Sequence, residues 1–162
     1  MNADEQLNER RHLHRLGNLF PNIEPIFFIT LCSNQRERIL TSGPLPDIII
    51  QTFKNAENFY GWLVGRYVIM PDHVHFFCIP NENAKPLSDF MKGFKRWTTK
   101  QSHACGFSGA LWQREFFDHV PRNSASFSEK WEYVRMNPVR AGLCGLPEEW
   151  VYSGEIHEYR VD

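Results

Sequence analysis

The stretch Met70-Pro71-Asp72-His73-Val74-His75-Phe76-Phe77-Cys78 decides the fold and the site that we expect from this sequence. Its first three residues predict a tight turn, and the residues after them predict a strand. Side chains alternate across a strand, so His73 and His75 share one face while Val74 lies on the other. Two neutral imidazoles on one face supply half of a divalent metal site. In an isolated motif they are more often two surface histidines, so the rest of the chain must decide.

The composition is that of a folded globular protein. The chain has 162 residues, of which 42% are apolar and 23% are charged, enough for one domain with its own core. The net charge of −1 gives no overall attraction to nucleic acid. Any nucleic-acid partner must therefore be held by a local basic surface.

The sequence gives no sign of export or of membrane insertion. No uncharged apolar run approaches the ~20 residues that span a bilayer, and residues 1–5 lack the layout of a signal peptide. The four cysteines, Cys32, Cys78, Cys105 and Cys144, lie far apart and form no C-x-x-C pair. This spacing argues against a disulfide framework. We expect a cytoplasmic protein with no membrane partner.

The pattern of apolar residues predicts an α+β fold. Aromatic and β-branched runs predict strands over 25–32, 62–70, 73–80 and 111–120. Helical spacing predicts helices over 45–60 and 87–102, and the capping box Ser126–Glu129 starts a third that ends before Pro138. This order is typical of a ferredoxin-like (RRM-like) antiparallel sheet with helices on one face and a further C-terminal helix. We expect a domain over 25–152, a basic arm or helix over 1–24 and a tail over 153–162.

The helix over 87–102 combines an apolar stripe with a basic flank. The expected core stripe is Leu87, Phe90, Met91, Phe94 and Trp97. Positive side chains recur on one flank, and a second basic cluster lies near the N-terminus; the candidates for DNA contact are Lys92, Lys95, Arg96, Lys100, Arg10, Arg11 and Arg15. Such flanks are also common on solvent-exposed helices, so phosphate binding is a hypothesis at this point.

The helix before Pro138 carries the third part of a site. Phe127, Trp131 and Val134 form its packing face, and Tyr133 and Asn137 are neighbours four residues apart beside that face. A tyrosine hydroxyl must be activated to act as a nucleophile at neutral pH. A divalent ion held by His73, His75 and the Asn137 carbonyl oxygen would polarise a phosphate. Mg²⁺ and Mn²⁺ both remain open.

Two further residues near these motifs have open roles. His119, beside Asp118, is an alternative metal ligand or proton carrier, or a strand-end histidine hydrogen-bonded to the carboxylate. Asp72 is expected to be a turn residue.

Three segments together resemble the IS200/IS605-like single-tyrosine (HUH) transposases. They are Met70–His75, then Leu111-Trp112-Gln113 with Phe117-Asp118-His119, and finally Tyr133-Val134-Arg135-Met136-Asn137-Pro138-Val139-Arg140-Ala141-Gly142-Leu143. Within that group the chain is most similar to the REP-associated tyrosine transposases, and the resemblance covers residues 25–152. Neither the His73-Val74-His75 motif nor the pair of Tyr133 and Asn137 is specific by itself. Their order in the chain, together with the Asn137–Leu143 string, is specific.

The resemblance implies a metal-dependent enzyme that nicks and rejoins single-stranded DNA near hairpins such as REP-like palindromes. His73 and His75 would be metal ligands, Tyr133 the nucleophile and Asn137 the third ligand. The tyrosine would form a 5′-phosphotyrosine intermediate and release a 3′-hydroxyl. REP-associated relatives look like monomers, which favours a monomer here, although a dimer with shared sites is the alternative.

Two other functions fit parts of the sequence. One is a non-catalytic module that binds single-stranded nucleic acid on a ferredoxin-like sheet, although the strands lack the RRM aromatic signature. The other is a structural zinc protein that uses His73, His75 and a cysteine, although the cysteine spacing offers no closed set of four ligands.

Overall fold

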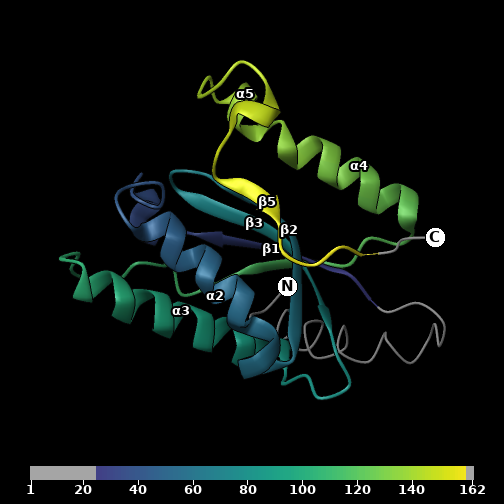
Figure 1. The fold of residues 1–162 in the computed structure, drawn as a ribbon, viewed down its shortest axis with the longest axis horizontal. Coiled ribbons are helices and arrows are strands. Elements are labelled where there is room, and N and C mark those ends of the chain that lie inside the picture. The colour runs from purple at the N-terminus through teal and green to yellow at the C-terminus, as the bar shows by residue number, and fades with distance from the viewer. Residues whose placement is uncertain (1–24, 160–162) are drawn as a thin grey trace, which may run out of the picture.

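A tight turn at Pro71–Asp72 joins the two longest strands of the sheet, β2 (Trp62–Ile69) and β3 (His73–Pro80). The Met70 amide closes this turn by donating to the His73 carbonyl oxygen at 2.8 Å. The hairpin expected from the sequence is therefore confirmed. The structure, a computed structural model, describes residues 25–159 (Figure 1).

The strands form one five-stranded antiparallel sheet. The outer members are β1 (Phe27–Cys32), β4 (Phe117–His119) and β5 (Ser153–Glu155). Their order is β4-β1-β3-β2-β5, and every pair is antiparallel. The first four strands have the expected ferredoxin-like arrangement. The fifth was not expected: it lies in the segment that we assigned to a tail and adds an edge next to β2.

Helices cover both faces of the sheet. In Figure 1, α2 (Leu45–Tyr60) and α3 (Leu87–Ala104) lie on one side, while α4 (Ser124–Arg135) and α5 (Asn137–Arg140) lie on the other. Two short 3-10 turns, Asn34–Arg36 and Pro147–Glu149, connect elements at the periphery. The sheet therefore separates the surface of α3 from that of α4.

The start of α4 differs from the expected capping box. The helix begins at Ser124, and Asn123 is the N-cap, since its side-chain oxygen accepts from the Ser126 amide at 2.8 Å. Asparagine and serine are about equally good N-cap residues. With Asn123 as the cap, Ser126 lies in the first turn of the helix and is not itself the cap. Of the apolar face expected on this helix, Phe127 and Val134 are buried and Trp131 is partly buried.

The expected strand over 111–120 is also shorter in the structure. Only Phe117–His119 pairs with β1, whereas Trp112 forms an isolated bridge with Ser33. Trp112 is buried, and its indole N–H donates to the Thr98 hydroxyl oxygen on α3 at 2.8 Å. The apolar character of this segment therefore reflects packing of side chains rather than a long strand.

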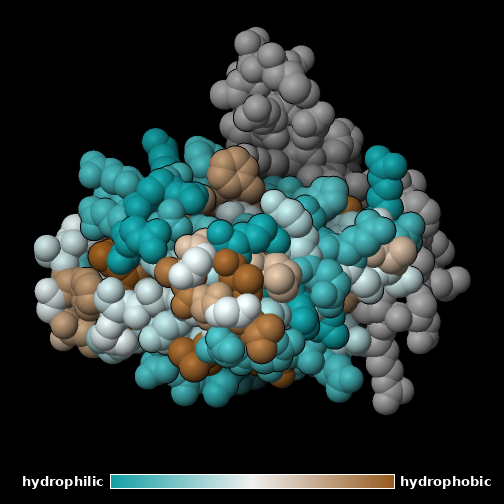
Figure 2. Space-filling view, turned by 90° about the horizontal axis from the view of Figure 1, so that it is seen from above, coloured by the Kyte–Doolittle hydropathy of each residue, from teal (hydrophilic) through white to brown (hydrophobic). Residues whose placement is uncertain are grey.

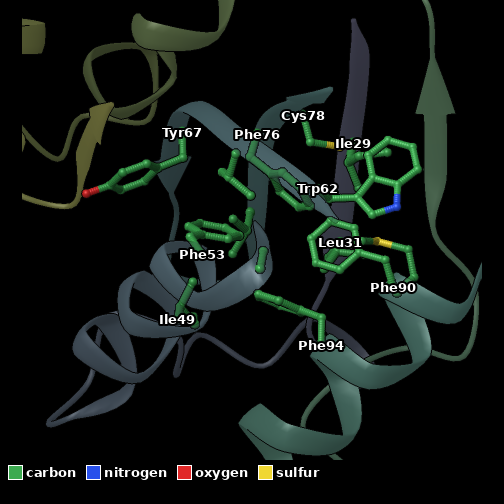
Figure 3. Packing of buried hydrophobic residues seen from close by; sticks show 14 of the residues in the cluster. Ile29, Leu31, Ile49, Phe53, Trp62, Tyr67, Phe76, Cys78, Phe90 and Phe94 are labelled. Atoms are coloured by element: carbon green, nitrogen blue, oxygen red, sulfur yellow. The ribbon is translucent and has the colours of Figure 1, made fainter. Parts of the chain in front are cut away.

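Aromatic rings build the core between the sheet and α2–α3 (Figure 3). The Phe53 ring lies 4.8 Å from Phe76 and 5.3 Å from Phe94, centroid to centroid. Trp97, expected in this core, is instead 47% exposed, and Thr98 takes the buried position next to it. After Phe94 the buried face of α3 therefore continues at Thr98, four residues on, and not at Trp97, three residues on.

A β-bulge in β2 changes which residues face this core. The register shifts between Val64 and Tyr67, so Gly65 and Arg66 together oppose one residue of β3. As a result Trp62, Val64, Tyr67 and Ile69 are all buried in one cluster, although their numbers change from even to odd. Arg66 is turned to the opposite face, where its guanidinium carbon lies 5.5 Å from the Trp131 ring centroid.

A smaller apolar cluster lies between the sheet and α4. It contains Phe28, Val68, Met70, Phe77, Phe127 and Val134. The Tyr159 hydroxyl donates to the Leu63 carbonyl oxygen nearby, and burial raises the pKa of this phenol. Within residues 25–159 no helix has the length and apolar character needed to cross a bilayer.

Candidate active site

His73 and His75 project from β3 toward the α4 side of the sheet. Their ring centroids are 4.7 Å apart, with the planes at 76°. Val74, between them, is fully buried on the opposite face. The alternation expected from the sequence is thus confirmed. Both rings are half-buried, which limits the ways in which they can turn.

Each ring is held through its Nδ1 atom. His73 Nδ1 lies 2.8 Å from the Asp72 carboxylate, and His75 Nδ1 lies 2.8 Å from the Thr30 hydroxyl oxygen on β1. A carboxylate only accepts, so His73 carries its proton on Nδ1. When the Nδ1–H of His75 donates to Thr30 in the same way, both Nε2 lone pairs are free for a ligand. Partners of this kind orient metal-binding histidines.

Arg36 fixes the carboxylate in turn. Its Nε and Nη2 atoms lie 3.0 and 2.9 Å from Asp72 Oδ2, and its Nη1 lies 2.9 Å from Cys32 Sγ. Arg36 and the preceding Gln35 have positive φ angles of 54° and 52°. Such backbone is strained for residues other than glycine, at a cost of about 1–3 kcal/mol each. This backbone conformation places the Arg36 guanidinium against the Asp72 carboxylate. Asp72 thus does more than form the expected turn.

Burial keeps the two imidazoles neutral. It lowers the pKa of His75 to about 3, aided by the charges of His73, Lys130 and Arg36. It also lowers the pKa of His73, although Asp72 acts in the opposite direction. Burial alone would raise the pKa of the Asp72 carboxyl, but His73 and Arg36 bring it below its ordinary value. At neutral pH the site is a carboxylate beside two neutral rings.

This donor set suits a divalent ion. Neutral imidazoles with free Nε2 atoms and an anionic neighbour are what such an ion requires. Among residues 25–159 no group of three or more His, Cys, Asp or Glu side chains could complete the site. A third protein ligand from these residues would therefore be of another type, such as an amide. The absence of such a group among these residues also gives no support to the structural zinc site with a cysteine ligand.

Lys130 of α4 reaches the same face, and the sequence analysis missed it. Its ammonium lies 5.1 Å from the Phe28 ring centroid, and Phe28 stacks on His75 at 5.2 Å. Lys130 and Tyr133 are three residues apart and are therefore neighbours on the helix surface. The three-residue spacing of Lys130 and Tyr133 in the sequence could have indicated that Lys130 lies near the candidate site. Lys130 and Tyr133 therefore lie on one flank of α4.

Tyr133 is an exposed side chain with a cation on its ring. The side chain is 65% exposed, and the Arg140 guanidinium carbon lies 4.0 Å from the ring centroid. Arg140 also donates to the Tyr133 carbonyl oxygen and to Asn137 Oδ1. An amide oxygen has two lone pairs, so one remains on Asn137 for another partner. The sequence predicted no role for Arg140, but in the structure this residue links Tyr133 to Asn137.

Figure 2 shows the α4–α5 side as a largely hydrophilic surface with apolar residues grouped near its middle. At the edge of the sheet, β4 adds Phe117 opposite Thr30 and His119 opposite Phe28. Opposed residues share a face, so both lie on the face of His75. His119 is two strands from His75, a backbone separation of about 10 Å. Within residues 25–159 His119 forms no group of three possible ligands with His73 and His75, so we leave it out of the ligand set.

The residues considered for DNA contact fall into three groups. Lys92, Arg96 and Lys100 line one pocket on the outer surface of α3. Lys95 differs: its ammonium donates to the carbonyl oxygens of Gln113, Arg114 and Glu115 at 2.8–3.0 Å. All three donors of Lys95 are occupied, and we remove it from the candidates. Arg10, Arg11 and Arg15 lie outside the described residues.

Comparisons with known proteins show which family the chain resembles. The family model described as "Transposase IS200 like" matches residues 26–136. The REP-associated tyrosine transposase of Escherichia coli (strain K12) is 25% identical over 130 residues, which cover 78% of this chain and 73% of that protein. A relative from Haemophilus influenzae is 24% identical over 150 residues, or 85% of this chain and 83% of that one.

A solved structure shares the fold. It is that of a REP-associated tyrosine transposase bound to a REP hairpin, with a TM-score of 0.68 and 21% identity over 86% of this chain and 92% of that chain. The five-stranded sheet with helices on both faces thus has a counterpart among solved structures.

Proposed function

The chain belongs to the family of IS200-like transposases, and from this membership we propose that it nicks and rejoins single-stranded DNA near hairpins. The observation that carries the proposal is the His73–His75 pair, with each Nδ1 already engaged and α4 bringing Tyr133 to the same side of the sheet. A strand with two surface histidines needs neither Thr30 nor Asp72 in these positions.

Tyr133 is the nucleophile of the proposed reaction. Its hydroxyl oxygen attacks a backbone phosphorus and forms a new P–O bond as the bond to the 3′ oxygen breaks. The tyrosine loses its proton, the departing 3′ oxygen gains one, and the 5′ end stays on the enzyme as a phosphotyrosine. Attack by the 3′-hydroxyl of a second strand reverses these changes and joins the two strands. Bond energy is conserved, so no other energy source is required.

His73 and His75 would hold a divalent ion through Nε2, with the Asn137 amide oxygen as the third protein ligand. Mg²⁺ or Mn²⁺ would polarise the phosphate and offset the negative charge that develops on it. Arg36 and Asp72 keep the His73 ring in place, and Thr30 does the same for His75. Arg140 keeps a positive charge beside the tyrosine, where the phosphate must approach.

We propose hairpin-bearing single-stranded DNA, such as REP-like palindromes, as the partner. The support is the REP hairpin bound by the solved relative and the basic pocket on α3. Phosphate contacts position DNA, whereas exposed bases specify it. We infer a cytoplasmic setting from the four free thiols. We propose a monomer, the state that the resemblance to REP-associated transposases implies, with a dimer that shares sites as the alternative.

The test is a cleavage assay on end-labelled DNA hairpins taken from repeats beside the gene. Wild type with Mn²⁺ should give a covalent adduct that survives denaturing gels, and EDTA should remove it. Tyr133→Phe should bind the same DNA and give no adduct, because only the hydroxyl is lost from an exposed ring. An adduct with Tyr133→Phe would exclude this tyrosine as the nucleophile.

The runner-up is a module that binds single-stranded DNA without cutting it. It requires the sheet and the basic surface but not the oriented histidines. Tight binding in EDTA together with no adduct on any hairpin, with either metal, would favour it over the transposase.

A further inference from the structure

A pocket of about 490 Å³ lies on the outer surface of α3, on the opposite side of the sheet from the histidine pair. Four of its lining residues are cations and one is a carboxylate; the residues are Tyr60, Lys85, Asp89, Lys92, Gly93, Arg96, Trp97 and Lys100. Its volume lies in the range of small-ligand sites. In a chain of net charge −1, this excess of positive charge is a local feature.

Two aromatic rings lie among these cations. Trp97 is 47% exposed, with the Lys100 ammonium 5.8 Å from its ring centroid. The Lys85 ammonium lies 5.7 Å from the Tyr60 ring centroid. Both rings therefore lie on one surface with the four cations. Exposed rings interleaved with Lys and Arg are typical of surfaces that stack bases and track a phosphate backbone.

Gly93 shapes the floor of the pocket. A methyl group added at this position would overlap the Tyr60 ring and hydroxyl. The tyrosine can therefore lie directly on the helix backbone, and its ring contacts Phe90 of the core at 5.3 Å. The floor is thus anchored in the core, whereas Trp97 and the cations form an exposed rim.

We propose that this pocket binds an unpaired nucleotide of the DNA substrate, with its base on Trp97 and its flanking phosphates on Lys92, Arg96 and Lys100. A base inside a duplex has both faces covered by its neighbours, whereas an unpaired base leaves a face open to stack on the indole. The inference rests on the proposed DNA function and deepens it. DNA would contact both sides of the sheet, chemistry on the α4 side and this hold on the α3 side.

The test is binding of the full chain to labelled hairpins, measured by fluorescence anisotropy in EDTA. One hairpin has a single-stranded extension, and the other is blunt with its loop replaced by a non-nucleotide linker, so that it has no unpaired base. Trp97→Ala should weaken binding of the extended hairpin by about 5- to 150-fold, the range for loss of one stacked base, and Trp97→Phe should keep most of the affinity. The blunt hairpin should respond much less to either change.

Matched controls lie on α2. Phe59, beside Tyr60, is 65% exposed but does not line the pocket, so Phe59→Ala should leave the affinity within about two-fold.

Arg96→Ala should reduce the slope of log affinity against log salt by about 0.7, one phosphate contact on a single strand. Lys54→Ala, an exposed cation away from the pocket, should leave that slope unchanged.

Three results would overturn the inference. They are equal affinity of wild type and Trp97→Ala for the extended hairpin, an equal loss in Phe59→Ala, and displacement of the DNA by polyglutamate of matched charge as readily as by an oligonucleotide. The last would identify a site for acidic polypeptides. The adduct assay on wild type separates this outcome from failure of the transposase: wild type should form the Tyr133 adduct whatever Trp97→Ala does to hairpin affinity.

Discussion

Thr30 and His75 face each other across β1 and β3, and the Thr30 hydroxyl oxygen lies 2.8 Å from His75 Nδ1. The two residues are 45 positions apart in the chain. The relationship makes a side chain of β1 part of the proposed metal site, because it sets which nitrogen of the ring is free.

Thr30→Val should therefore weaken metal binding while preserving the fold. Valine has nearly the shape of threonine but cannot accept the Nδ1–H, so the ring loses its fixed orientation. Loss of such a partner typically lowers metal affinity about 10- to 100-fold. Mn²⁺ titration followed by electron paramagnetic resonance would measure this without any DNA. Thr99→Val, on α3, is the control and should bind Mn²⁺ as wild type does.

Removal of the cation on α4 should slow the chemistry rather than weaken metal binding. Lys130 lies over Phe28 and acts on His75 through its charge. Lys130→Gln should lower the rate of adduct formation about 10- to 100-fold, the effect of losing about 1.4–2.7 kcal/mol of charge stabilisation. Lys130→Arg should recover most of the rate. Equal single-turnover rates for wild type and Lys130→Gln would exclude a role for this charge.

The metal-free protein should lose stability as the pH falls below about 6.5. The pKa of His75 is lowered to about 3 in the fold, whereas an unfolded histidine has its ordinary value near 6.5. Between these values the unfolded chain binds a proton that the folded chain refuses, so the free energy of unfolding rises with pH.

The expected loss for His75 is about 2 kcal/mol between pH 7 and pH 5. Urea unfolding at both pH values would measure it. His75→Gln has no group that titrates in this window, so its loss should be smaller by about that amount. A His75→Gln protein with the same loss as wild type would show that other groups cause the effect.

Lys95 should matter for stability and not for DNA. Its ammonium holds three consecutive carbonyl oxygens of the segment that leads to β4, and burial lowers its pKa. Lys95→Met keeps the apolar stem and removes these bonds, at an expected cost of about 1–3 kcal/mol. Thermal unfolding would show this loss. The salt dependence of hairpin binding should stay that of wild type, in contrast to Arg96→Ala.

Local patterns in the sequence predicted most of the fold. The turn at Met70-Pro71-Asp72 predicted the β2–β3 hairpin, and alternation predicted the shared face of His73 and His75. Helical spacing predicted the bounds of α2 at Leu45 and Tyr60. The segment over 111–120 misled, because Leu111 and Trp112 are buried by packing of a loop. A three-residue edge strand such as β5 has no periodicity of its own and depends on its partner β2.

The supporting residues of the site could not be predicted in this way. Arg36 is 36 positions from Asp72, and its role depends on a positive φ that its residue type does not favour. Trp97 illustrates the reverse error: its apolar side chain fits the core stripe of α3 by spacing, but Thr98 is the buried residue. One residue of rotation on the helix decides between core and surface.

Both outer strands of the sheet are short. β4 and β5 each have three residues, next to inner strands of six and eight. Within the described residues, the open backbone groups at either edge are therefore too few to template a long intermolecular ladder. The expected consequence is resistance to amyloid-like stacking at high protein concentration, even though the interior is rich in phenylalanine and β-branched strands.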